Sequence, residues 1–217
     1  RTQALRPAEA TNDMALKRPR MIAVLPTMLT LGNAACGFGA VTFAARLGPE
    51  QAGENNLLIA SLLIFFGMVF DALDGHAARL TNQTSELGAQ LDSLCDAITF
   101  GIAPAFLMLQ FVGHEHVGSG TGRHLEFPQR FLWTIGLLYV LSTILRLARF
   151  NVETEEDDSH EFFSGLPSPA AAGTIAAFPI GMPELKRIAL LTDSPRLADW
   201  LLPGAKILMV GVTLAVA

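Results

Sequence analysis

Charged residues are scarce in this chain of 217 residues: 16% of them are Asp, Glu, Lys or Arg, whereas 51% are hydrophobic. The mean hydropathy of +0.40 lies on the apolar side of soluble domains, which excludes an ordinary soluble protein. The net charge of −5 provides no basic excess, so no nucleic acid partner is expected. Cysteine is also rare, and Cys36 and Cys95 lie in apolar runs, where we interpret them as small buried residues and not as a disulfide framework. The sequence therefore predicts an integral membrane protein.

Long apolar runs divide the chain into predicted membrane helices of about 20 residues each, a length that suits a hydrocarbon core about 30 Å thick. These helices are expected at approximately residues 27–46, 57–80, 90–112, 131–149, 165–182 and 200–217. The predicted fold class is an all-α integral membrane bundle of at least six transmembrane helices.

Two regions are expected on either side of residue 24. Residues 1–24 predict a polar tail and an amphipathic helix that lies on the membrane surface, with Pro26 as the break before the first membrane helix. Residues 25–217 predict one transmembrane domain, and because the sequence ends inside an apolar run, further chain is expected after Ala217. Five basic residues among the first 20 favour an amino terminus in the cytoplasm. The connection between the second and third helices then faces the cytoplasm as well.

That connection carries an unusual concentration of acid. The segment from residue 71 to residue 96 reads DALDGHAARLTNQTSELGAQLDSLCD and holds four aspartates at the ends of two apolar helices: Asp71, Asp74, Asp92 and Asp96. At about 100° per residue, each pair of aspartates shares one face of its helix. Four facing carboxylates repel one another at low dielectric unless cations neutralise them, and oxygen ligands suit magnesium, calcium or manganese. The segment therefore predicts a site for two divalent cations.

Small residues accompany the carboxylates and leave room for a phosphate-bearing substrate. Gly75, Ala78 and Gly88 lie on the same helix faces, and the Arg79 guanidinium can hold a phosphate oxygen. Two alternatives are open at this point. Carboxylates solvated at helix ends would explain neither their number nor their shared faces, and an ion-coupled transporter would carry its acidic site near mid-membrane.

The spacing D-x2-D-G-x2-A-R-x8-G-x3-D-x3-D resembles the signature of the CDP-alcohol phosphotransferase family, and all eight fixed positions are present. The resemblance implies transfer of a phosphatidyl-type group from a CDP-linked lipid to an alcohol, with release of CMP. It also implies two Mg²⁺ or Mn²⁺ ions on the four aspartates, with Ca²⁺ as a non-productive occupant, and Asp96 as the base. Gly75, Ala78, Arg79 and Gly88 would line the nucleotide and diphosphate pocket. The habit of the family and the Gly- and Ala-rich helices predict a homodimer.

The first membrane helix adds a second match. It resembles the family pattern P-N-x2-T-x2-N-x3-G-F, with Thr27 in place of the usual Asn, at Pro26, Thr30, Asn33, Gly37 and Phe38. The resemblance implies that Thr30 and Asn33 form hydrogen bonds with the nucleotide. The alternative is that both side chains bond a neighbouring helix, as Thr and Asn often do within membranes.

The acceptor is suggested by residues after the fourth apolar run. The sequence RLARFN from Arg146 to Asn151, followed by the Gly165–Pro169 turn, resembles the phosphatidylserine synthase branch of this family. This resemblance implies CDP-diacylglycerol and L-serine as substrates, with Arg146 or Arg149 binding the serine carboxylate and Ser168 receiving its ammonium. Two alternatives stay open: the arginines are anchors at the membrane surface, or the acceptor is glycerol phosphate or inositol phosphate.

Overall fold

The computed structural model describes residues 21–46, 50–81, 86–113, 128–156, 166–191 and 195–217. Every regular element in these ranges is helical, which confirms the all-α prediction. The elements are α1 (Met21–Ala45), α2 (Glu50–Thr81), α3 (Glu86–Asp96), the π-helical η1 (Ala97–Ile102), α4 (Ala103–Gly113), α5 (Gln129–Glu156), α6 (Ser168–Leu191) and α7 (Pro195–Val216).

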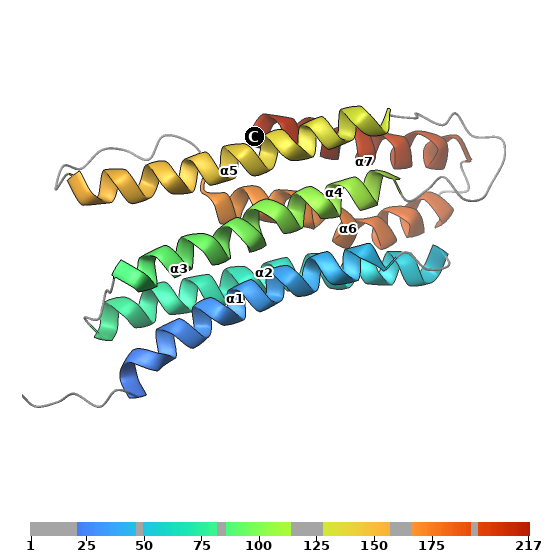
Figure 1. The fold of residues 1–217 in the computed structure, drawn as a ribbon. Helices are drawn as coiled ribbons and strands as arrows, with labels where there is room; N and C mark the ends of the chain where they lie inside the picture. Colours follow the sequence, from blue (N-terminus) through green and yellow to red (C-terminus); the bar gives the residue numbers. More distant parts are fainter. Residues whose placement is uncertain (1–20, 47–49, 82–85, 114–127, 157–165, 192–194) are drawn as a thin grey trace, which may run out of the picture.

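The centre of the bundle is one continuous rod made of α3, η1 and α4. Figure 1 shows this rod in green, running between α2 and α5, and its segments contact the other five helices. The candidate membrane span Leu87–Gly113 belongs to this rod, and 67% of an 18-residue apolar stretch within it is buried. The corresponding share is 28% in each of the other three candidate spans. The rod is therefore the element around which the other helices pack.

Four helices in the described ranges are long and apolar enough to cross a membrane. Their spans are Pro26–Ala45, Gly53–Ala77, Leu87–Gly113 and Gln129–Val152. The fifth and sixth predicted membrane helices correspond to α6 and α7. Neither helix is among the four candidate spans. Pro179 and Pro183 lie inside α6 and charged residues follow them, while the apolar part of α7 is the short stretch Pro203–Val216. The chain is an integral membrane protein with four candidate spans in its described residues, so six are not confirmed.

The predicted break at Pro26 is wrong, because α1 passes through this residue without interruption. Proline removes one backbone donor, but neighbouring helices and side chains make this tolerable inside a membrane helix. Separately, the Pro26 carbonyl accepts a hydrogen bond from the Thr30 hydroxyl of the same helix at 3.0 Å. Of the predicted surface helix, residues 21–24 form the start of α1 and residues 1–20 lie outside the described residues.

Several predicted loops are helical. The polar connection predicted at residues 47–56 is helical from Glu50, and α5 continues to Glu156 into a segment predicted as a loop. Between the fifth and sixth predicted helices the sequence predicts a polar loop with Lys186, Arg187 and Arg196. In the structure, Lys186 and Arg187 lie in α6 and Arg196 lies in α7. Glu, Gln, Lys and Arg are good helix formers, so a helix continues past the apolar stretch that the hydropathy pattern detects.

Close packing fixes the rod at η1. Thr99 in η1 faces Gly37 of α1 and Gly67 of α2: a Cβ at Gly67 would lie 2.5 Å from Thr99 Cγ2, and one at Gly37 would lie 2.8 Å from Thr99 Cα. Only glycine allows both helices to approach this closely. Beyond η1, the largest fully buried apolar side chains include Leu107 and Met108 of α4. The core and the glycine contacts hold the rod in place immediately after Asp96.

Candidate active site at the ends of α2 and α3

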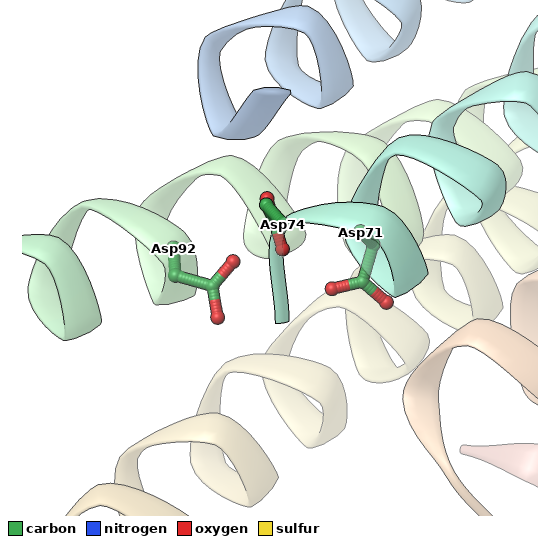
Figure 2. A group of neighbouring side chains, drawn as sticks. All are labelled: Asp71, Asp74 and Asp92. Carbon is green, nitrogen blue, oxygen red and sulfur yellow. The ribbon is translucent and has the colours of Figure 1, made fainter. Parts of the chain in front are cut away.

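Three carboxylates from two helices meet at one end of the bundle. Asp71 and Asp74 project from α2 and Asp92 projects from α3, and each offers an oxygen within 4.8 Å of the others. Figure 2 shows Asp71 and Asp92 facing each other across a gap, with Asp74 between them. We call these residues the three-carboxylate cluster. The helical spacing in the sequence predicted this meeting, and the structure confirms it for three of the four aspartates.

The cluster has oxygen atoms that the protein leaves unsatisfied. Asp74 is buried, and Asp71 and Asp92 are half-buried. Asp74 Oδ2 and Asp92 Oδ1 are buried and have no hydrogen-bond partner. A buried carboxylate oxygen without a partner is costly, and three anionic side chains so close together repel one another. A hard divalent cation would satisfy both needs, so the donor set fits magnesium or manganese.

Asp96 lies outside this group. It is buried on α3, and its Oδ1 accepts a hydrogen bond from Asn33 Nδ2 of α1 at 2.9 Å. The spacing of four residues places it one turn beyond Asp92 on the same face. Its expected roles as a fourth ligand and as the base stay predictions.

The two polar residues predicted to bind the nucleotide are buried in α1. The Thr30 hydroxyl donates to Pro26 O within its own helix, whereas Asn33 is fully buried and bonds the rod. The Asn33 carbonyl also accepts a hydrogen bond from Thr99 Oγ1 at 2.9 Å. For Asn33, the helix-to-helix contact that the sequence left open as an alternative is therefore present.

The small residues of the motif lie next to the cluster aspartates in sequence. Gly75 is exposed, and a Cβ placed there would meet nothing within 4 Å. Gly88 is half-buried on α3, one turn before Asp92. Ala78 and Arg79 belong to the last turns of α2, but their side chains lie outside the described part of the structure. There is thus room at Gly75, and the diphosphate pocket stays a prediction.

The predicted acceptor residues lie on two other helices. Arg146 is half-buried and Arg149 is exposed, both on α5, and Ser168 is buried at the first position of α6. Tyr139, Thr143 and Arg146 follow a spacing of four and three residues, so they share one face of α5. The Tyr139 hydroxyl donates to Phe100 O in η1 at 2.9 Å, so this face of α5 is turned toward the rod.

One contact beside the cluster was missed in the sequence. Ser93, which follows Asp92, pairs with Asn151 of α5: the Asn151 amide donates to Ser93 Oγ at 2.9 Å, and Ser93 Oγ lies 3.1 Å from Asn151 Oδ1. This pair joins α3 to α5 next to a predicted metal ligand. Asn151 closes the RLARFN motif, so the signal was present, but spacing alone does not reveal a partner 58 residues away.

The structure thus places three carboxylates at one end of a helical bundle with membrane-spanning helices, and this arrangement can be compared with known families. The model of the CDP-alcohol phosphatidyltransferase family matches residues 23–212. The chain belongs to this family.

Individual relatives narrow the comparison. The chain is 33% identical over 168 residues to the CDP-diacylglycerol–serine O-phosphatidyltransferase of Mycobacterium tuberculosis, covering 75% of this chain and 50% of that protein. It is 35% identical over 130 residues to the Helicobacter pylori protein of the same name, covering 60% and 49%. It is 34% identical over 156 residues to the archaetidylserine synthase of Methanothermobacter thermautotrophicus, covering 71% and 57%. The chain spans about half the length of the curated relatives it matches.

Proposed function

We propose that this protein transfers the phosphatidyl group of CDP-diacylglycerol to the hydroxyl of L-serine and releases CMP. The observation that carries the proposal is the three-carboxylate cluster, formed by two helices of a chain that belongs to the CDP-alcohol phosphatidyltransferase family. The serine-specific names of several relatives support the choice of acceptor. The RLARFN motif on α5 supports it as well.

Asp71, Asp74 and Asp92 would hold the divalent cations, Mg²⁺ or Mn²⁺, through carboxylate oxygens that include the two unpartnered ones. When bound, such cations polarise a diphosphate and stabilise the departing CMP oxygen. The open space at Gly75 admits the diphosphate beside the cluster. Arg79, four residues further along α2, is proposed to hold a phosphate oxygen.

Asp96 is proposed as the base. Its Oδ1 is occupied by the Asn33 amide, so Oδ2 is the atom that receives the proton of the serine hydroxyl. The serine oxygen then bonds to the phosphorus that carries the diacylglycerol, and the bond from that phosphorus to the CMP oxygen breaks. One proton moves to Asp96 and CMP leaves, so this step requires no covalent intermediate on the protein.

Arg146 and Arg149 are proposed to bind the serine carboxylate, with Ser168 near its ammonium. Arg146 is the stronger candidate, because it shares the α5 face that Tyr139 turns toward the rod. A planar guanidinium binds a carboxylate through two parallel hydrogen bonds, which an ammonium does not reproduce. Arg146→Lys or Arg149→Lys is therefore expected to raise the serine KM about tenfold. Arg130→Lys, an exposed change near the other end of α5, is the matched control.

The decisive assay measures CMP release from CDP-diacylglycerol by purified protein in mild detergent with Mg²⁺ or Mn²⁺. L-Serine, glycerol phosphate and inositol phosphate are compared as acceptors, together with a sample that lacks acceptor. We expect release with serine and little release without it. Faster turnover of either phosphorylated acceptor would reject serine but keep the phosphotransferase. No release with any acceptor would reject the proposed function.

The same proposal includes the setting of the enzyme. We place the cluster at the cytoplasmic face of the cell membrane, because the basic amino-terminal segment favours that orientation. We also propose that α6 and α7 complete six spans and that the protein is a homodimer. Labelling of single cysteines introduced on either side of the membrane tests the topology, and particle mass in mild detergent tests the dimer.

A further inference from the structure

Asn33 occupies a position that no substrate can reach directly. Its side chain is 0% exposed and lies between α1, α2 and the rod. The amide nitrogen donates to Asp96 Oδ1 at 2.9 Å, and the main-chain carbonyl accepts from Thr99 Oγ1 at 2.9 Å. One residue of α1 is thus tied to two successive turns of the rod, on either side of the point where α3 ends.

The amide is held in one orientation. An ionised carboxylate only accepts hydrogen bonds, so the NH₂ group of Asn33 must face Asp96. Asn33 Oδ1 is then left buried without a hydrogen-bond partner, and a Cβ at Gly67 would lie 3.0 Å from it. A buried, unpartnered oxygen is unfavourable, so packing alone would favour an apolar residue here. The bond to Asp96 is what accounts for an asparagine.

Because a π turn follows Asp96, the hydrogen bond from Asn33 affects the direction in which the Asp96 side chain points. In η1 the Ala103 amide donates to Ile98 O, five residues earlier, so the rod is wider here than a regular α-helix. An extra residue in a helical turn rotates the side chains before that turn, here those of α3, relative to the side chains after it, here those of α4. The orientation of the Asp96 carboxylate therefore depends on the contacts that fix η1. Thr99 holds it from the α1 side, and the Tyr139 hydroxyl holds it from the α5 side through Phe100 O.

We infer that Asn33 is a positioning residue that fixes the carboxylate of Asp96 for proton transfer, that the Thr99 hydroxyl keeps Asn33 in register, and that Asn33 does not bind the nucleotide. The role of Asp96 rests on the proposed function. The statement about the nucleotide does not, because it concerns a side chain with no exposed surface.

The first test separates turnover from binding. Asn33→Ala leaves Asp96 free to take other orientations, and a misplacement of about 1 Å costs on the order of 100-fold in rate. We therefore expect kcat to fall about 100-fold while the KM for CDP-diacylglycerol stays within about twofold. Thr42→Val is the control, because Thr42 is a polar residue of α1 whose hydroxyl donates to Phe38 O of its own helix. If Asn33 instead bound the nucleotide, Asn33→Ala would raise the KM for CDP-diacylglycerol and change kcat much less, which would contradict the inference.

The second test uses two variants that keep the fold. Thr99→Val keeps the branched shape beside Gly67 but loses the hydroxyl, whereas Thr99→Ser keeps the hydroxyl and loses the methyl group. If the hydroxyl positions Asn33, the valine variant loses about tenfold in kcat and the serine variant stays near the native value. If only packing matters, the order is reversed, and the inference about Thr99 is wrong.

Equilibrium binding of radiolabelled CMP in the presence of Mg²⁺ decides the nucleotide question without turnover. We expect Asn33→Ala and the native chain to bind CMP with Kd values within about twofold, since the side chain is buried. A Kd raised tenfold or more would overturn the inference even if the native chain proved inactive with every acceptor. That inactivity would instead reject the proposed function, so the two failures are distinguishable.

Discussion

The central rod has two halves of equal length that behave differently. In α3, Cys95 and Asp96 are the buried residues among those whose side chains the structure describes, and the Asp92 and Ser93 side chains are only half-buried. In α4, seven residues are buried: Ala103, Pro104, Ala105, Leu107, Met108, Phe111 and Val112. One half borders a partly open acidic cluster, and the other half forms the core. The π turn of η1 lies between them.

This difference shows how a membrane protein can maintain a cluster of like charges. The carboxylates repel one another and two of their oxygens are unsatisfied, so the site end contributes little to stability without a cation. The apolar half of the same rod contributes close packing against its neighbours instead, because packing holds helices together where lipid is as apolar as the side chains. Substitutions in α3 and in α4 should therefore separate activity from stability.

The largest effect is expected at the site end. Asp92→Asn or Asp71→Asn keeps the shape of the side chain but removes a charge that the cations need. We expect CMP release to fall at least about 1,000-fold, as losses of this kind do when charge stabilisation of a transition state is removed. The thermal midpoint without divalent ions should stay the same or rise, because like-charge repulsion decreases. Glu184→Gln, an exposed acid on α6, is the control and should change neither.

A variant of Asp92 that kept a tenth of the native rate would remove the distinction between the two halves. So would a large loss of thermal stability on neutralising the charge, because the cluster would then be a structural element.

The core half should show the reverse pattern. Leu107 is 0% exposed in α4, and Leu107→Ala removes buried apolar volume. Such substitutions cost about 2–5 kcal/mol of unfolding free energy, whereas the activity of the folded fraction should stay within about twofold. Unfolding in detergent, measured together with CMP release, provides both numbers. Leu137→Ala on α5, with 57% of its surface exposed, is the matched control and should cost much less.

The smallest effect is expected at the contact that joins α3 to α5. Asn151→Ala removes the reciprocal pair with Ser93, which is half-buried, so about 0.5–1.5 kcal/mol of stability should be lost. Ser93→Ala should cost about the same amount, and the double variant should add little more. Strictly additive losses in this cycle would mean that the two side chains do not depend on each other. The Ser93–Asn151 pair would then not couple the acidic half of the rod to α5.

The sequence predicted those features that depend on local periodicity. Helical spacing placed Asp71 and Asp74 on one face and Asp92 on another, and the structure brings these faces together. It could not reveal that Asp96 accepts a hydrogen bond from Asn33 of α1, because the two residues lie 63 positions apart in the chain. Nor does a hydropathy pattern reveal a π turn, since η1 is an apolar stretch like the α-helix α4 that follows it.

The predicted boundaries of several helices were wrong for a similar reason. Pro26 signals a break in an isolated helix, but inside a packed bundle its missing bond is tolerated and α1 continues. Polar residues at the ends of α2 and α5 extend those helices without changing the apolar run. The tight contacts of Thr99 with Gly37 and Gly67 join three separate helices, so no single stretch of sequence encodes them.

The central claim is that Asp71, Asp74 and Asp92 together hold a divalent cation. It is tested most directly by titrating the purified protein with Mn²⁺ and counting bound ions by electron paramagnetic resonance, without any substrate. The account predicts saturable binding by the native chain and by Glu184→Gln, and an affinity at least about tenfold weaker in Asp74→Asn and in Asp92→Asn. Equal Mn²⁺ affinity in the native chain and in both aspartate variants would contradict it.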